Sequence, residues 1–147
     1  MLKIRLLTIL TIMALFSVVL TACTQNESNP FEEELEGVRW KLESYGVKGN
    51  MSELLEGTEI TAEFDTGEGR LEGSAGCNSY FADYEITGNT LTITQLAFTE
   101  MACMDPAGVM DQESDYLEIL RLSETFEVDG GELQITSGDD VLIYKSN

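Results

Sequence analysis

The chain contains no histidine, and this absence removes several kinds of catalytic site. Without an imidazole, neither a Ser-His nor a Cys-His nucleophile can form, and no histidine can serve as a general base. The glycine-rich stretch 67–69 carries Glu68 where a phosphate would sit, and no lysine follows it. We therefore expect a protein that is not an enzyme and that uses neither a cofactor nor a metal.

Basic residues are scarce as well. Eight lysines and arginines stand against 27 aspartates and glutamates, which gives a formal net charge of −19. Such a surface repels nucleic acid and anionic lipid headgroups, so no nucleic-acid partner is expected. The same charge would attract a basic protein, or it would serve only to keep the domain soluble.

The amino-terminal segment has the layout of a secretory signal. Lys3 and Arg5 precede an apolar run over residues 6–20, and Leu-Thr-Ala then leads to Cys23. This ending is similar to the lipobox of bacterial lipoproteins, in which the cysteine is acylated and becomes the new amino terminus. Two alternatives stay open: an uncleaved anchor, although a spanning helix needs about 20 apolar residues, and ordinary cleavage after Ala22.

We therefore divide the chain into a signal peptide over residues 1–22, an acylated cysteine with an acidic tether over 23–36, and one domain over 37–147. The lipid on Cys23 would attach the protein to a membrane of the cell envelope. Thr24 is not the aspartate that signals inner-membrane retention in many enteric bacteria. A host with two membranes would then carry the protein on its outer membrane facing the periplasm, and any other host on the outer face of its cell membrane.

Cys77 and Cys103 remain once Cys23 is assigned to the lipid. In an exported protein, two such cysteines favour a disulfide. Free thiols and a metal pair are the alternatives, but two sulfurs without a histidine make a poor zinc site, since a closed site uses four ligands.

Alternating apolar and polar residues separated by glycine-rich turns predict about eight short strands and a loop over 47–58. The alternation shifts at residues 96–99, which indicates either a bulge or a strand that leaves the sheet. Asp105 and Pro106 suit the start of one helix over about 106–122. The expected class is α+β, a curved, mostly antiparallel sheet or small barrel packed by that helix. Glu113 falls on the apolar stripe of the helix, so it must accept hydrogen bonds from a neighbouring loop, pair with Arg70, or line the mouth of a cavity.

Three stretches of the domain resemble the META domain family, whose members include the HslJ-like envelope proteins. They are Trp-Lys-Leu at 40–42, Gly-Ser-Ala-Gly-Cys-Asn-Ser-Tyr at 73–80 and Thr-Glu-Met-Ala-Cys-Met at 99–104, followed by Gln-Glu at 112–113. The resemblance implies a small α+β domain, a link to stress responses and novobiocin tolerance, and pairing of the two domain cysteines. It brings no catalytic residues. It implies structural roles for Trp40, Gly76, Asn78, Tyr80, Thr99, Met101 and Glu113.

The expected function is that of a lipid-anchored, non-enzymatic envelope protein that acts in stress or antibiotic tolerance by binding a protein or another envelope component. Two alternatives remain. One is a module that binds an apolar ligand or chaperones lipoproteins, with a cavity between sheet and helix. The other is an inhibitor of a basic cell-wall hydrolase, for which an acidic surface is electrostatically suited.

Overall fold

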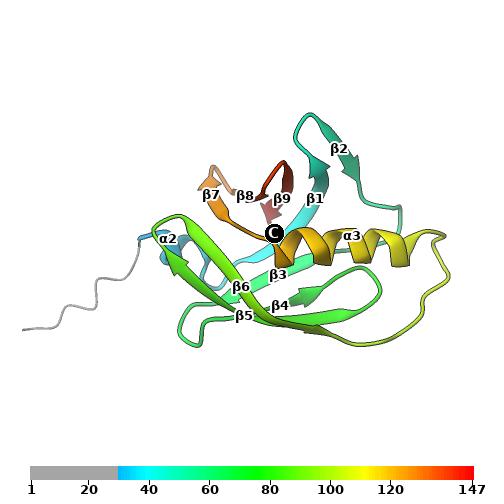
Figure 1. Ribbon diagram of the computed structural model, residues 1–147, viewed down its shortest axis with the longest axis horizontal. Helices are drawn as coiled ribbons and strands as arrows, with labels where there is room; N and C mark the ends of the chain where they lie inside the picture. Colours follow the sequence, from blue (N-terminus) through cyan, green and yellow to red (C-terminus); the bar gives the residue numbers. More distant parts are fainter. Residues whose placement is uncertain (1–29) are drawn as a thin grey trace, which may run out of the picture.

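The computed structural model describes residues 30–147, with side chains from Glu32 onward, and shows one curved sheet with two helices (Figure 1). The signal peptide, Cys23 and residues 24–29 of the expected tether lie outside the described residues. The elements, in chain order, are α2 (Pro30–Leu35), β1 (Arg39–Val47), β2 (Asn50–Glu53), β3 (Thr61–Asp65), β4 (Arg70–Ser74), β5 (Ser79–Thr87), β6 (Thr90–Phe98), α3 (Val109–Arg121), β7 (Thr125–Asp129), β8 (Glu132–Ser137) and β9 (Asp140–Ser146).

The nine strands form an antiparallel sheet in the order β2-β1-β3-β4-β5-β6-β7-β8-β9, and β1 also pairs with β9, so that the sheet closes on itself. The predicted α+β class and curved antiparallel sheet are confirmed. The strand beyond the expected eight is β2, which pairs with the end of β1 where the sequence predicted a loop. The short run around Met51 shows too little alternation to reveal a strand.

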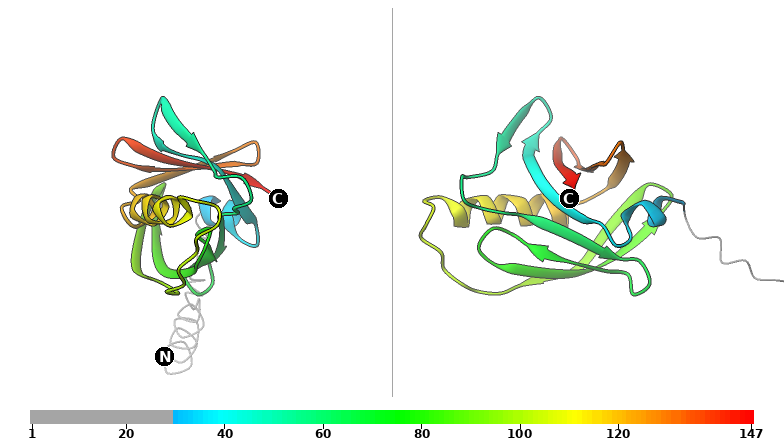
Figure 2. Two further views of the ribbon diagram at one scale, coloured as in Figure 1. Left: turned by 90° about the vertical axis from the view of Figure 1, so that its right-hand side faces the viewer. Right: turned by 180° about the vertical axis from the view of Figure 1, so that it is seen from behind.

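The ring is weakest between β6 and β7. These two strands share a single residue pair, Thr90 with Thr125, and two flanking backbone hydrogen bonds hold the junction. Helix α3 lies against this side of the sheet. Figure 2 shows it between the part of the sheet that contains β7–β9 and the part that contains β3–β6. The helix therefore fills the ring where the strands separate, and its buried face completes the core.

The centre of the core is polar as well as aromatic. The hydroxyl groups of Tyr80, Tyr116 and Tyr144 are buried within hydrogen-bonding distance, 2.8 Å for the first pair and 3.1 Å for the second. Tyr80 also donates to the Thr61 carbonyl at 2.9 Å. Each hydroxyl of this tyrosine cluster therefore has a partner, as buried polar groups require. The cluster ties β5, α3 and β9 together.

Glycine is required at position 73 because β3 and β4 approach closely there. A Cβ at this position would lie 1.9 Å from the Thr61 carbonyl oxygen, which is far inside van der Waals contact. The carbonyl is held by Tyr80, so it cannot move away freely. Gly73 thus permits the strand spacing that the tyrosine cluster needs.

Two boundaries differ from those expected. The helix begins at Val109 rather than at 106, and Asp105 does not cap it: the N-cap is Gly108, which has φ +90°. The folded domain begins before Gly37, because residues 30–35 form α2 and Leu35 is fully buried. Within residues 30–147, no helix is long and apolar enough to cross a membrane.

Candidate functional site

A disulfide and one carboxylate hold the loop after β4. Cys77 is bonded to Cys103, so the predicted disulfide is confirmed. The Glu113 carboxylate, 3% exposed, accepts hydrogen bonds from the backbone amides of Cys77 (3.2 Å) and Asn78 (2.6 Å) and from the Asn78 side-chain amide (2.6 Å). The first of the three alternatives for Glu113 is thus observed, and the third is observed as well, because Glu113 is also among the residues that line a groove between β6 and α3. Arg70 pairs instead with Glu68 on the surface.

Asn78 connects this loop to the segment after β6. Its Oδ1 accepts hydrogen bonds from the Thr99 hydroxyl (2.8 Å) and the Met101 amide (2.7 Å), and its Nδ2 donates to the Met101 carbonyl (3.1 Å). Asn78 is 2% exposed, and its side chain forms four hydrogen bonds in total. The structure therefore brings Cys77, Asn78, Thr99, Met101, Cys103 and Glu113 together, and we call this set the motif clamp.

Gln112 extends the clamp to a third segment, a role that the sequence pattern did not predict. Its Oε1 accepts from the Leu55 amide at 2.7 Å, and its Nε2 donates to the Thr58 hydroxyl at 3.0 Å. Gly76, at φ +109°, lies directly beside it, since a Cβ there would be 3.3 Å from Gln112 Nε2. The sequence signal that could have identified this role of Gln112 is the polar Gln-Glu pair at 112–113, which lies beside an apolar stripe of the helix.

Trp40 and Tyr80 lie in the core and not in the clamp. Tyr80 belongs to the tyrosine cluster, and burial raises its pKa well above the usual value near 10. Trp40 is buried on β1, and its indole N–H has no hydrogen-bond partner among the described residues. Both residues therefore serve the fold.

Beyond the clamp, a groove of about 470 Å³ runs between β6 and α3. Leu96 and Phe98 line it from the strand, and Met110 and Leu117 line it from the helix. Phe98 is opposite the buried Tyr80 in the sheet and so lies on the inner face, yet 48% of it is exposed. The groove is an opening in the ring at which inner-face apolar side chains meet solvent.

The apolar character continues along the loop that leads into α3. Met101 is 56% exposed and Met104 is 91% exposed. The loop is held against the start of the helix, where the Cys103 amide lies 3.4 Å from the Met110 sulfur. Methionine side chains are flexible and polarisable, and they are common where a surface accommodates an apolar partner. We call the residues Leu96, Phe98, Met101, Met104, Met110 and Leu117 the groove set.

A second groove of about 640 Å³ lies on the other side of α3, between the helix and β1–β2. It is lined by carboxylates, among them Asp115, Glu118 and Asp140. Partial burial raises the pKa of Tyr45, and the nearby Asp115 carboxylate raises it further. No group of three or more acidic or cysteine side chains in residues 30–147 is arranged to hold a metal ion.

Comparison with known proteins identifies a family match and solved structures with a similar fold. The sequence matches the META domain family over residues 33–147, whereas no curated protein matches it. An NMR structure of a Burkholderia xenovorans protein is similar, with a TM-score of 0.65, 23% identity and coverage of 82% of this chain and 88% of that one. A crystal structure of a DUF4847 family protein from Bacteroides vulgatus has a TM-score of 0.57 and 14% identity, covering 80% and 97% of the two chains. These likenesses concern the fold, and the match over most of the sequence shows that the chain belongs to the META domain family.

Proposed function

We propose that this protein is a lipid-anchored envelope protein whose META domain binds a protein partner and does not act as an enzyme. The observation that carries the proposal is that the hydrogen-bonded motif residues and the exposed apolar side chains lie next to each other in the domain. The clamp residues are hydrogen-bonded to one another, while four members of the groove set expose apolar side chains to solvent: Phe98, Met101, Met104 and Met110. Exposed apolar side chains gathered on a strongly acidic protein are typical of an interaction site.

Anchoring on Cys23 is supported by the sequence of the amino-terminal segment. A role in envelope stress or antibiotic tolerance is supported by the resemblance of the domain to its family. The apolar-ligand alternative would use the β6–α3 groove, which Leu96, Phe98 and Leu117 line with apolar side chains. An inhibitor of a basic hydrolase remains one form of the proposed protein binding.

Two measurements test the proposal. The first is metabolic labelling with an alkyne fatty acid. The full chain should be labelled and should sediment with membranes, whereas Cys23→Ser should remain unlabelled and should not sediment with them. An unlabelled wild-type chain would refute the anchor. The second is titration of a basic lysozyme into the anchored protein at low salt. Binding that weakens steeply above a salt concentration of about 0.1 M supports an electrostatically guided protein partner.

A further inference from the structure

We infer that the β6–α3 groove takes an extended, basic segment of a partner polypeptide, which pairs with the open edge of β6. This inference rests on the proposed function and gives it a site and a partner chemistry. Three independent features of the described residues support it: an unpaired strand edge, an apolar groove beside that edge, and a local excess of negative charge.

The first feature is the edge of β6. Beyond the Leu91 amide, which donates to the Glu124 carbonyl, β6 pairs only with β5 within residues 30–147. The Thr99 amide donates to the carbonyl of Ser79, the first residue of β5. Because successive residues of an antiparallel strand direct their N–H and C=O groups to opposite edges, the neighbouring Phe98 directs its backbone groups away from β5. The backbone of Leu96 and Phe98 therefore borders the groove without a partner strand.

The sequence of this edge is suited to pairing. Residues 92–98 contain no charged side chain and no proline, the residues that commonly protect an exposed edge. A bulge lies within the segment: the register shifts between Phe81 and Asp83, and Gln95 has φ +50°. The strand continues past this bulge through Phe98, so the last residues still present an extended edge.

The second feature is the apolar lining of the groove. A peptide paired with β6 would direct alternate side chains into and out of the sheet. Those on the inner side would meet Phe98 from the strand and Met110 and Leu117 from the helix. Backbone pairing would thus be accompanied by burial of alternate apolar side chains.

The third feature is charge. Residues 71–120, which include β5, β6 and most of α3, contain nine acidic side chains and no basic one. Two carboxylates, Glu113 and Glu118, line the groove together with one basic side chain, Arg121. A basic segment is therefore favoured over an acidic one, and an anionic membrane surface or a second copy of this acidic chain would be repelled.

The test uses short labelled peptides and the full chain held in phosphatidylcholine nanodiscs, with empty nanodiscs as the blank. The first peptide alternates lysine and valine over about seven residues, enough to follow the open edge. The second has the same sequence with every backbone amide N-methylated, so that neither of its edges can donate hydrogen bonds to a strand. The third replaces lysine by glutamate. Fluorescence anisotropy should show binding of the first peptide only.

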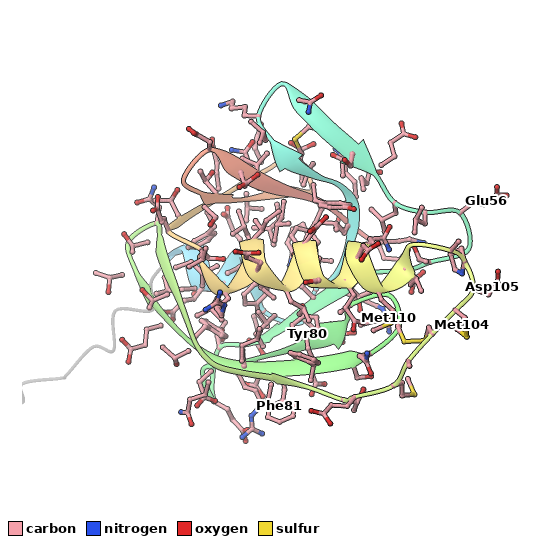
Figure 3. All side chains as sticks on the ribbon, turned by 45° about the vertical axis from the view of Figure 1, so that its right-hand side comes forward. Glu56, Tyr80, Phe81, Met104, Asp105 and Met110 are labelled. Carbon is pink, nitrogen blue, oxygen red and sulfur yellow. A yellow bond between two sulfur atoms is a disulfide. The ribbon has the colours of Figure 1, made fainter. Side chains whose placement is uncertain are left out.

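Phe98→Ser and Phe81→Ser form a matched pair of protein variants. Both phenylalanines belong to the β5–β6 hairpin and are about half exposed, at 48% and 56%. Phe98 lines the groove, whereas Phe81 lies on the outer face of β5, on the opposite side from Tyr80 (Figure 3). Phe98→Ser should weaken binding of the lysine–valine peptide about tenfold or more, as truncating a central contact does. Phe81→Ser should leave it within about twofold.

Three results would overturn the inference: no binding of the lysine–valine peptide at low salt, equal binding of the N-methylated peptide, or equal loss in both phenylalanine variants. The N-methylated peptide leaves the protein unaltered, so it decides the matter even if Phe98→Ser disturbs the fold. Salt-sensitive binding of basic lysozyme that neither phenylalanine variant alters would leave the proposed function standing and remove this groove as its site. Absence of binding by every basic probe would count against both.

Discussion

The Glu113 carboxylate offers a sharp test of the clamp. We expect Glu113→Gln to destabilise the domain even though the two side chains have nearly the same shape. The carboxylate accepts two hydrogen bonds of 2.6 Å and one of 3.2 Å, and its residue is 3% exposed. A carboxamide has a single acceptor oxygen, so its amino group would face either the backbone donors or the Asn78 side-chain amide.

Rotating Asn78 would not relieve this conflict. Its Oδ1 accepts from Thr99 and from the Met101 amide, and its Nδ2 donates to the Met101 carbonyl. An inverted amide would set donor against donor and acceptor against acceptor at these positions. With a charged hydrogen bond worth about 1.5–3 kcal/mol, loss of one short bond predicts a destabilisation of about 2 kcal/mol for Glu113→Gln. Loss of both short bonds predicts about 4 kcal/mol for Glu113→Ala.

Urea unfolding of the oxidised mature chain measures both values, and Trp40, the single tryptophan, provides a buried fluorescence probe. Glu118→Gln is the matched control, because Glu118 is an exposed glutamate of the same helix. This control should stay within about 0.5 kcal/mol of the wild type. A Glu113→Gln variant as stable as the control would refute the argument. So would additive effects of Glu113→Ala and Asn78→Ala, since directly bonded residues should show a coupling energy of about 1 kcal/mol or more.

Three further predictions concern the rest of the domain. Gly73→Ala should prevent stable folding, because its Cβ would lie 1.9 Å from a backbone oxygen, whereas Gly67→Ala in the same hairpin has 3.4 Å of clearance and should be nearly neutral by thermal melting. Reduction should destabilise the chain by about 3.5 kcal/mol in the chain-entropy treatment of the loop from Cys77 to Cys103; an unchanged melting curve with both thiols alkylated would contradict this. Burial raises the pKa values of the tyrosine cluster, so the stabilisation present below pH 10 should be lost as the pH rises further, because the unfolded chain then ionises first. Absorbance at the tyrosinate band should increase together with unfolding, and earlier ionisation of all tyrosines in the folded domain would count against it.

The sequence predicted what depends on side-chain alternation and on buried polarity. Period-two patterns indicated which residues face inward, and they located eight of the nine strands, all except β2. Glu113 was notable because a carboxylate on an apolar stripe needs hydrogen-bond donors. The donors are the backbone amides of Cys77 and Asn78 in a neighbouring loop. The start of α3 and the helix α2 were missed for local reasons. Gly108 at φ +90° ends the preceding turn after Pro106, and one buried leucine is enough to fix an acidic segment to the core.

The open edge of β6 could not be predicted, because alternation reports the two faces of a strand and says nothing about its two edges. Whether an edge is paired depends on where the chain goes next, and here it leaves β6 for a loop and α3 before β7 returns at a single residue pair. The motif clamp holds that departing loop through Thr99 and Met101. The clamp thus keeps the edge and the groove set in place, and its Glu113 carboxylate, which also lines the groove, is hydrogen-bonded to Cys77 and Asn78. It follows that binding should be altered mainly by changes at Phe98 and Met110, and stability mainly by changes at Asn78 and Glu113.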